Sequence, residues 1–463
     1  MIKIPGIILS ALLVAAMPLS AAQQRGPAPT IVATPFKATG IYSVGEKAGW
    51  SISPAPGATP PAGDFTYTVK TNNAATIKTG TFSLASGQAS IEVVQNDPAM
   101  LFVQITPPPA TPAPAAAPAD GGAPAAPAGA RRGGGGRGGP GGLKLGAAVA
   151  PTKLEPAIPR PADFDAFWDG KLAELAKIPI NPVLTPTPTD KAGVEFYTVK
   201  LDSLGSHTQG YLAKPAREGK FPAIIQFQYA GVYALSPASS QDRAAEGWLA
   251  FNVDSHDIPP TEGQQQHPET NNYQSKGNTD RETSYFLNMY LRDARAVDYI
   301  KSRPDWDGKT IVFQGISMGG QQSLATAGLR ANDVTAVLVL VPSGADIAGS
   351  LHGRTAGYPN WGTNDPKVAA TSPYFDTISF APRIKASVLL AMGFIDTIAP
   401  PVGNWTVLNQ IPGPKEAVPL IDAAHNNEST AQQLAPYENR VKEVRDILLK
   451  TGKFTPDEKY TKP

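Results

Sequence analysis

The chain has 463 residues, enough for two or three domains at roughly 150 residues each. Its 40 Lys and Arg against 39 Asp and Glu leave a formal charge of +1, which gives no basis for a general nucleic-acid or polyanion binder. It has 0 Cys, which excludes disulfides, thiolate metal sites, iron–sulfur ligation and a cysteine nucleophile.

The first 22 residues have the pattern of a signal peptide. Met1 to Lys3 give a short positive start, and Ile7 to Met17 form an apolar run too short to cross a bilayer comfortably. Small residues at Ser20 to Ala22 suit cleavage near Ala22. We expect residues 1–22 to be removed, so that the protein is periplasmic or extracellular and keeps no stable membrane span. An uncleaved anchor or a buried N-terminal helix is the alternative.

Residues 28–106 have the pattern of short strands broken by turns. Five segments alternate along the chain, are rich in β-branched or aromatic residues, and are bounded by Gly, Pro or Asn: 48–52, 65–69, 80–84, 89–93 and 101–105. This spacing predicts an immunoglobulin-like β-sandwich. Because the region contains no histidine and no carboxylate cluster, we expect a structural or docking role for it, with independent sugar binding as the alternative.

Residues 107–150 are predicted to be a disordered linker. Between residues 107 and 142 nearly every residue is Ala, Gly or Pro; the exceptions are Thr111, Asp120, Arg131, Arg132 and Arg137. Such a stretch has no apolar surface to bury, so it is expected to be mobile and partly extended.

Residues 151–463 alternate apolar strand candidates with helical stretches. The strand candidates are 221–227, 248–253, 310–313, 336–341, 386–390 and 417–421. Short apolar runs of this kind are typical of strands buried on both faces. A helix is predicted between two of them, over 285–302. The alternation predicts a doubly wound, mostly parallel α/β sheet.

The sequence Gly315-Ile316-Ser317-Met318-Gly319 lies between a predicted strand and a predicted helix. G-x-S-x-G in this setting is the nucleophile elbow of α/β-hydrolases. Ser317 would project from a sharp turn, and both glycines would be small because a side chain there would collide with the neighbouring strand or helix. The backbone N–H of Met318 would then point toward a developing oxyanion. The alternative is a glycine-rich turn with an idle serine.

A serine nucleophile needs a base and an orienting carboxylate, which follow the serine in this order of the chain: acid, then histidine. Of the five histidines, only His425 follows Ser317 and a late acid. Asp396 comes just after the strand candidate 386–390 and is the preferred acid. Asp422 and Asp346 are the alternatives.

The second oxyanion donor should come from the turn after the strand candidate 221–227. We choose the backbone N–H of Tyr229, with Ala230 next and an ordinary glycine turn as the alternative. Further side chains are candidates for binding substrate, although buried core is the other expectation for the aromatic ones: His256, Tyr285, His352, Tyr358 and Trp361. The chemistry needs no metal and no organic cofactor.

Together these residues resemble the acetyl xylan esterase and cephalosporin-C deacetylase family, carbohydrate esterase family seven of the α/β-hydrolase superfamily. The resemblance covers roughly residues 161–427 and is carried by these segments: 167–169, 222–229, 290–297, 303–307, 315–320, Asp396 with 400–401, and His425. It implies Ser317 as nucleophile with Asp396 and His425 as partners, and the Tyr229 and Met318 amides as the oxyanion hole. The family often forms closed rings, which implies a homo-oligomer.

Two departures from the family pattern stand out. The family usually has Gln after the nucleophile, where this chain has Met318. Since only the backbone N–H is used at that position, catalysis should survive. The family also carries an Arg-Gly-Gln-Gly segment where this chain reads Ser255 to Pro260, and that change puts the choice of substrate in question.

The resulting hypothesis is a secreted serine esterase that removes acetyl or similar small acyl groups from carbohydrate esters such as acetylated xylan. Its partner is the acylated carbohydrate, and no nucleic acid is involved. The alternatives are another α/β-hydrolase, either a broad carboxylesterase or a serine peptidase, and a non-catalytic surface-binding protein.

Overall fold

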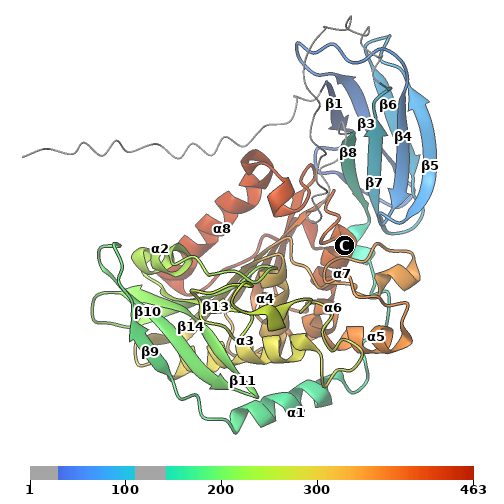
Figure 1. Ribbon diagram of the computed structural model, residues 1–463. Helices are drawn as coiled ribbons and strands as arrows, with labels where there is room; N and C mark the ends of the chain where they lie inside the picture. The colour runs from blue at the N-terminus through green and yellow to red at the C-terminus, as the bar shows by residue number, and fades with distance from the viewer. Residues whose placement is uncertain (1–29, 110–141, 463) are drawn as a thin grey trace, which may run out of the picture.

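The computed structural model describes residues 30–109 and 142–462. The predicted signal peptide and most of the low-complexity stretch therefore lie outside the described residues. No helix in the described ranges is long and apolar enough to cross a membrane. The described chain forms an N-terminal β unit (residues 30–109 and 142–149) beside a larger C-terminal α/β unit (residues 151–462), as Figure 1 shows.

The N-terminal β unit consists of two sheets that share one core. One sheet has the order β1-β3-β6 and the other β2-β8-β7-β4-β5. The strands are β1 (Ile31–Pro35), β2 (Ile41–Tyr42), β3 (Lys47–Pro54), β4 (Phe65–Thr71), β5 (Ala75–Phe82), β6 (Ala89–Val94), β7 (Ala99–Thr106) and β8 (Leu143–Val149). Trp50 and Ile91 from the first sheet pack with Val69 and Val103 from the second. All five segments predicted as strands overlap strands of this unit.

Strand β8 corrects the predicted extent of the linker. Leu143 to Val149 were expected to be linker, but they pair antiparallel with β7, with Ile105 opposite Leu143. Leu145, Ala147 and Val149 alternate along the strand and are buried in the core of the N-terminal β unit. The linker prediction is therefore wrong for these residues. Their small side chains give no strand signal in the sequence, and the strand depends on pairing with β7.

A nine-stranded sheet forms the centre of the C-terminal α/β unit, in the order β17-β16-β15-β14-β12-β13-β11-β10-β9. The six strands from β17 to β13 in this order pair parallel, and β11, β10 and β9 continue antiparallel. The predicted, mostly parallel α/β sheet is confirmed. The strands are β9 (Val183–Pro186), β10 (Val194–Ser203), β11 (Ser206–Pro215), β12 (Phe221–Phe227), β13 (Leu249–Asp254), β14 (Trp306–Ile316), β15 (Ala336–Leu340), β16 (Ser387–Gly393) and β17 (Lys415–Leu420).

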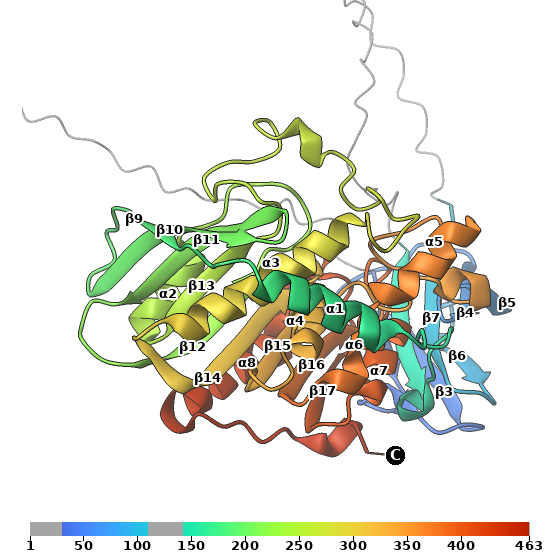
Figure 2. The same cartoon turned by 90° about the horizontal axis from the view of Figure 1, so that it is seen from below.

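Helices cover both faces of this sheet. They are α1 (Phe164–Ala176), α2 (Ala238–Glu246), α3 (Tyr285–Ser302), α4 (Met318–Leu329), α5 (Pro366–Thr371), α6 (Thr377–Phe380), α7 (Pro401–Gln410) and α8 (Ala431–Thr451). Leu324 of α4 and Trp405 of α7 pack with strand residues such as Phe313 on one face. Val441 of α8 packs on the other face with residues such as Val312. Figure 2 shows α3, α4 and α7 on one side of the strands and α8 on the other.

The N-terminal β unit packs against loops that follow β16 and β17. Phe102 forms a small buried cluster with Ile395 and Ala424, which come after these two strands. A second contact lies at Thr355, whose backbone N–H and hydroxyl donate to the carbonyls of Asn72 and Asn73 at 3.1 and 2.7 Å. The two units therefore meet at the edge of the sheet where the strands end.

Candidate active site

The turn after β14 has the geometry of a nucleophile elbow. Strand β14 ends at Ile316 and helix α4 begins at Met318, which leaves Ser317 between them with φ 55° and ψ −121°. A positive φ at a non-glycine residue is strained and persists only where the surrounding structure enforces it. Ser317 is thereby placed at the carboxyl end of the strand, where parallel sheets present their reactive groups.

The two glycines of the motif have a steric explanation in the structure. A Cβ atom at Gly315 would lie 2.2 Å from the carbonyl oxygen of Gly319. A Cβ atom at Gly319 would lie 2.3 Å from the carbonyl oxygen of Phe227, at the end of β12. Both distances are shorter than any real contact, so the spacing of the motif follows from how closely β14, α4 and β12 approach one another.

His425 links Ser317 to Asp396. Its Nε2 atom lies 2.9 Å from the Ser317 hydroxyl oxygen, and its Nδ1 atom lies 2.7 Å from an Asp396 carboxylate oxygen. The other Asp396 oxygen accepts the backbone N–H groups of Ile398 and Ala399 at 2.7 and 2.8 Å. With Nδ1–H donating to the carboxylate, Nε2 is free to accept the serine proton. The three residues are buried, with exposed fractions of 6, 4 and 1% for serine, histidine and aspartate.

The two alternative acids lie elsewhere. Asp346 is buried and forms an ion pair with Arg354, with 2.8 Å between the charged atoms. Asp422 is exposed, and its backbone carbonyl accepts the side chain of Gln433. Neither carboxylate bonds to His425, so the structure brings Asp396 alone of the three candidates to the histidine.

The turn after β12 lies against the start of α4. Gln322 of α4 donates its side-chain amide both to the Gln228 carbonyl at 2.9 Å and to the Met318 carbonyl at 3.1 Å. Within the described part of the chain, no acceptor receives the backbone N–H of Tyr229, Ala230 or Met318. These three N–H groups therefore remain open to an acceptor from outside the described chain.

His256 is buried next to this turn. Its Nε2 atom lies 3.0 Å from the Gly231 carbonyl oxygen, and its Nδ1 atom lies 3.0 Å from the Tyr285 hydroxyl. Burial, with a smaller effect from the nearby Arg292, lowers the pKa of His256 to about 3. Burial also raises the pKa of Tyr285 to about 12. At neutral pH a neutral His256 therefore donates to Gly231 and accepts from Tyr285.

Two tyrosines surround the side chain of Met318. The Tyr273 hydroxyl accepts the Gly231 N–H at 2.9 Å and lies 2.8 Å from the Tyr358 hydroxyl. The Tyr358 hydroxyl donates to the Met318 sulfur at 3.2 Å. Sequence reasoning missed Tyr273, because it lies in a loop without any motif or periodic pattern.

Two other predicted substrate-binding residues make no hydrogen bond to Ser317, Asp396 or His425 in the described part of the chain. His352 is exposed at the end of the short helical turn Gly349–His352. Trp361 is buried in a cluster with Phe286 and Phe375, and its indole N–H donates to the Gln274 carbonyl. The structure therefore gives Trp361 a core role and leaves His352 on the surface. No group of three or more metal-ligating side chains occurs among the described residues.

Comparison with known proteins identifies the family. The model of the family described as acetyl xylan esterase (AXE1) matches residues 152–350 and 358–440. The chain belongs to the acetyl xylan esterase family. The resemblance drawn from the sequence is thus confirmed, and membership in the acetyl xylan esterase family makes the protein a carboxylic ester hydrolase. The alternative of a non-catalytic surface-binding protein is set aside. The matched residues exclude the N-terminal β unit.

Similar proteins agree with the acetyl xylan esterase assignment. Acetyl esterase Axe7A of Xylanibacter ruminicola is 33% identical over 311 residues, which cover 63% of this chain and 70% of that protein. An acetyl xylan esterase from Paenibacillus sp. R4 has a TM-score of 0.56 at 23% identity and covers 63% of this chain and 98% of its own. Acetyl xylan esterase 1 from Thermoanaerobacterium sp. JW/SL YS485 has a TM-score of 0.54 at 23% identity, and the match covers 62% of this chain and 97% of that protein's chain. The two solved structures show that the fold is shared.

Proposed function

We propose that the protein is an exported serine esterase that removes acetyl or similar small acyl groups from carbohydrate esters such as acetylated xylan. The observation that carries this proposal is the position of His425, which lies within hydrogen-bond distance of both Ser317 and Asp396. The names of the similar proteins, which are acetyl esterases and acetyl xylan esterases, support the acyl group and the carbohydrate.

The proposed reaction uses this geometry in two stages. The Ser317 hydroxyl oxygen attacks the ester carbonyl while His425 Nε2 takes its proton, and Asp396 stabilises the resulting imidazolium. The Tyr229 and Met318 N–H groups stabilise the oxyanion. When the C–O bond to the sugar breaks, His425 returns the proton to the sugar oxygen, and the acyl group stays on Ser317. Water then attacks the acyl-enzyme and gives a proton to His425. When the bond between the acyl carbon and the Ser317 oxygen breaks, His425 returns that proton to the Ser317 oxygen, and the carboxylic acid leaves.

His256 acts as a positioning residue in this scheme. Its neutral ring holds the carbonyl of Gly231, two residues after Tyr229. Because the proposed oxyanion donor is the backbone N–H of Tyr229, fixing the turn fixes the donor. Because burial lowers the pKa of His256 to about 3, its ring is neutral at neutral pH and keeps both hydrogen bonds.

The first experiment is hydrolysis of p-nitrophenyl acetate by the wild type and Ser317→Ala. We expect the rate to fall by several orders of magnitude, because nucleophile, base and acid act as a unit. Ser86→Ala is the matched control, since Ser86 is exposed in the N-terminal β unit. Equal rates for wild type and Ser317→Ala contradict the proposal.

Substrate class and processing need separate measurements. Release of acetate from acetylated xylan, without cleavage of a peptide anilide, supports the carbohydrate esterase and excludes the peptidase. Preference for simple alkyl esters over acetylated xylan would favour a broad carboxylesterase.

The mass of the mature protein tests cleavage near Ala22, and light scattering tests the proposed homo-oligomer. We keep the immunoglobulin-like type of the N-terminal β unit as a proposal, which its two facing sheets support.

A further inference from the structure

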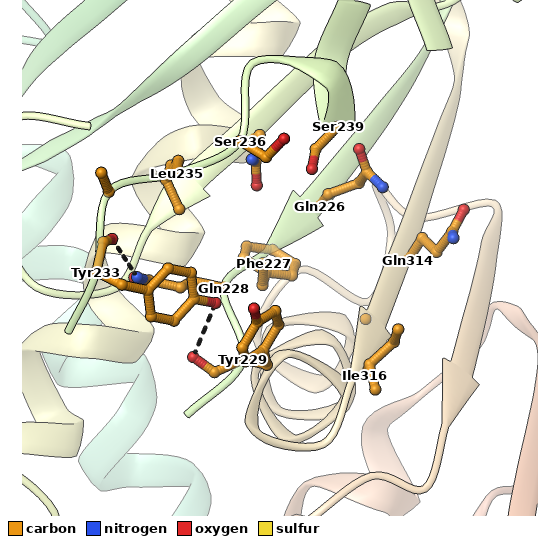
Figure 3. Close-up of a pocket in the computed structure, with 13 residues that line it drawn as sticks. Gln226, Phe227, Gln228, Tyr229, Tyr233, Leu235, Ser236, Ser239, Gln314 and Ile316 are labelled. Atoms are coloured by element: carbon orange, nitrogen blue, oxygen red, sulfur yellow. Dashed lines mark hydrogen bonds between the residues drawn. The ribbon is translucent and has the colours of Figure 1, made fainter. Parts of the chain in front are cut away.

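A cavity of about 240 Å³ lies beside the nucleophile elbow, at the carboxyl ends of β12 and β14. Figure 3 shows Gln226, Ser236 and Ser239 together at one end of it, and the rings of Tyr229 and Tyr233 side by side at another. We propose that this cavity is the subsite that binds the sugar ring of the ester substrate. The inference rests on the proposed carbohydrate esterase function and assigns recognition of the sugar to particular residues.

Three amide side chains line the cavity from adjacent strands. Gln226 of β12 lies in register with Asn252 of β13 on one side and with Gln314 of β14 on the other. Residues paired in register point to the same face of a sheet. Two positions earlier on β12 and β14, the same face carries Ile224 and Val312, which are fully buried in the apolar core under α8. The amides therefore interrupt an apolar pattern at the point where the cavity begins.

The fold leaves most of these polar atoms without partners. The Gln226 side-chain oxygen is buried and has no hydrogen-bond partner in the structure. The Asn252 amide, on a residue only 5% exposed, makes no hydrogen bond with any described residue. Gln314 accepts one bond from Arg445 at 3.3 Å, and its NH₂ group has no hydrogen-bond partner among the described residues. Because a buried polar group without a partner costs free energy, a cluster of such groups fits a ligand rich in hydroxyls.

An aromatic pair supplies the apolar half of the subsite. Tyr229 and Tyr233 stack with their ring centroids 4.7 Å apart, and both line the cavity. Tyr229 is 54% exposed, although its side chain is large and aromatic. A sugar ring has apolar C–H faces and polar hydroxyl edges, so aromatic faces beside amides match its chemistry.

The position of the cavity ties it to the reaction. Gly315 and Ile316, which also line it, precede Ser317 directly, and Tyr229 contributes the proposed oxyanion donor. Ser317 itself does not line the cavity, so the sugar ring would lie beside the residues that precede the nucleophile and not on the nucleophile itself. At about 240 Å³ the cavity is smaller than the roughly 300–1,000 Å³ typical of pockets for drug-sized ligands, so it suits a single ring better than an oligosaccharide.

The test compares a sugar ester with an ester that lacks a sugar. For each variant, kcat/KM is measured on triacetylated methyl β-D-xyloside and on p-nitrophenyl acetate, and the ratio of the two values is taken. Gln226→Met and Asn252→Leu keep the size of the side chain and remove the amide. We expect each to lower the ratio about fivefold or more, as the loss of a hydrogen bond in the transition state predicts. The surface variant Asn332→Leu is the control and should keep the wild-type ratio.

Variants of Tyr233 test the aromatic side without touching the strands. Tyr233→Ala should lower the ratio, and Tyr233→Phe, which keeps the ring, should restore most of it. A wild-type ratio in all four cavity variants, with their unfolding temperatures close to that of the wild type, overturns the subsite and leaves a cavity that holds only water.

A binding measurement separates failure of the subsite from failure of the proposed function. Ser317→Ala is titrated with unacetylated methyl β-D-xyloside, and the shifts of its tyrosine signals are followed by NMR. Binding that Asn252→Leu abolishes supports the subsite independently of catalysis. If Ser317 proves unnecessary for hydrolysis, the esterase mechanism fails, whereas the absence of any sugar binding counts against the subsite alone.

Discussion

Phe102 of the N-terminal β unit packs against Ile395, the residue directly before Asp396. The same cluster contains Ala424, the residue directly before His425. The N-terminal β unit thus touches both loops that hold the proposed acid and base, although it lies outside the residues that match the family. We therefore predict that this contact helps to position the proposed triad.

Replacing Phe102 tests this role. Phe102→Ala should destabilise the protein by about 2–4 kcal/mol, because a buried aromatic contact is lost. It should also lower kcat more than it raises KM, since the two loops are less well held, and Phe102→Leu should recover part of the loss. Thermal unfolding and steady-state kinetics give the measurement. Phe82→Ala, which changes the same unit away from the contact, is the control, and an equal loss of kcat there would rule out a specific role for Phe102.

The choice of acid can be checked by three matched substitutions. Asp396→Asn should lower kcat by about 10⁴-fold, because the amide holds the histidine in the wrong tautomer. Asp422→Asn should have little effect, since this carboxylate is exposed and does not contact His425. Asp346→Asn should reduce stability through its ion pair with Arg354 and leave the pH profile of kcat unchanged. An activity loss at Asp422 or Asp346 that matched the loss at Asp396 would contradict the assignment.

The close packing at the elbow makes Gly319 intolerant of a methyl group. Gly319→Ala should abolish most activity and reduce stability, because its Cβ would lie 2.3 Å from a backbone carbonyl oxygen that cannot move away easily. Gly170→Ala is the matched control, since no atom lies within 4 Å of the added Cβ in helix α1. That change should stabilise the protein by up to about 1 kcal/mol. Chemical denaturation and p-nitrophenyl acetate hydrolysis decide between these outcomes.

The buried, neutral His256 predicts a dependence of stability on pH. Its pKa is about 3 in the folded protein against 6.5 in the unfolded chain, so the unfolded state binds the proton more readily. The contribution of a neutral His256 is therefore fully present above pH 6.5 and is lost as the pH falls toward 3. Asp254, whose pKa burial raises to about 7, opposes this trend in the wild type.

Comparison with His256→Gln isolates the histidine, since Asp254 is common to both proteins. The free energy of unfolding of the variant should fall less steeply between about pH 6 and pH 4. Urea denaturation at several pH values measures the two slopes. Parallel slopes for the wild type and the variant would show that His256 gains protons in the folded state as readily as in the unfolded state.

Elements that a short run of neighbouring residues can specify were predicted from the sequence. Apolar runs identified the parallel strands, and the G-x-S-x-G spacing identified the elbow with Ser317. The order of the chain selected His425 and favoured Asp396. Strand β8 escaped prediction because Gly146 and its alanine neighbours look like linker, and only pairing with β7 makes them a strand.

The surroundings of the site depend on tertiary packing and were harder to predict. Nothing near Trp361 in the sequence shows that it enters an aromatic core, and nothing near Tyr273 shows that it approaches Gly231. The amides of Gln226, Asn252 and Gln314 lie within apolar strands, and their alignment appears only when the register of three strands is known.

The pairing of Ile105 with Leu143 changes how the low-complexity stretch should be regarded. The stretch begins after β7 and ends before β8, and these two strands are neighbours in the N-terminal β unit. Its length therefore does not set the distance between the N-terminal β unit and the C-terminal α/β unit. Their covalent junction is Ala150 alone, between β8 and the helical turn that starts at Pro151. Shortening the Ala/Pro/Gly stretch should therefore leave the position of the N-terminal β unit relative to the C-terminal α/β unit unchanged. One extra residue beside Ala150 should change that position.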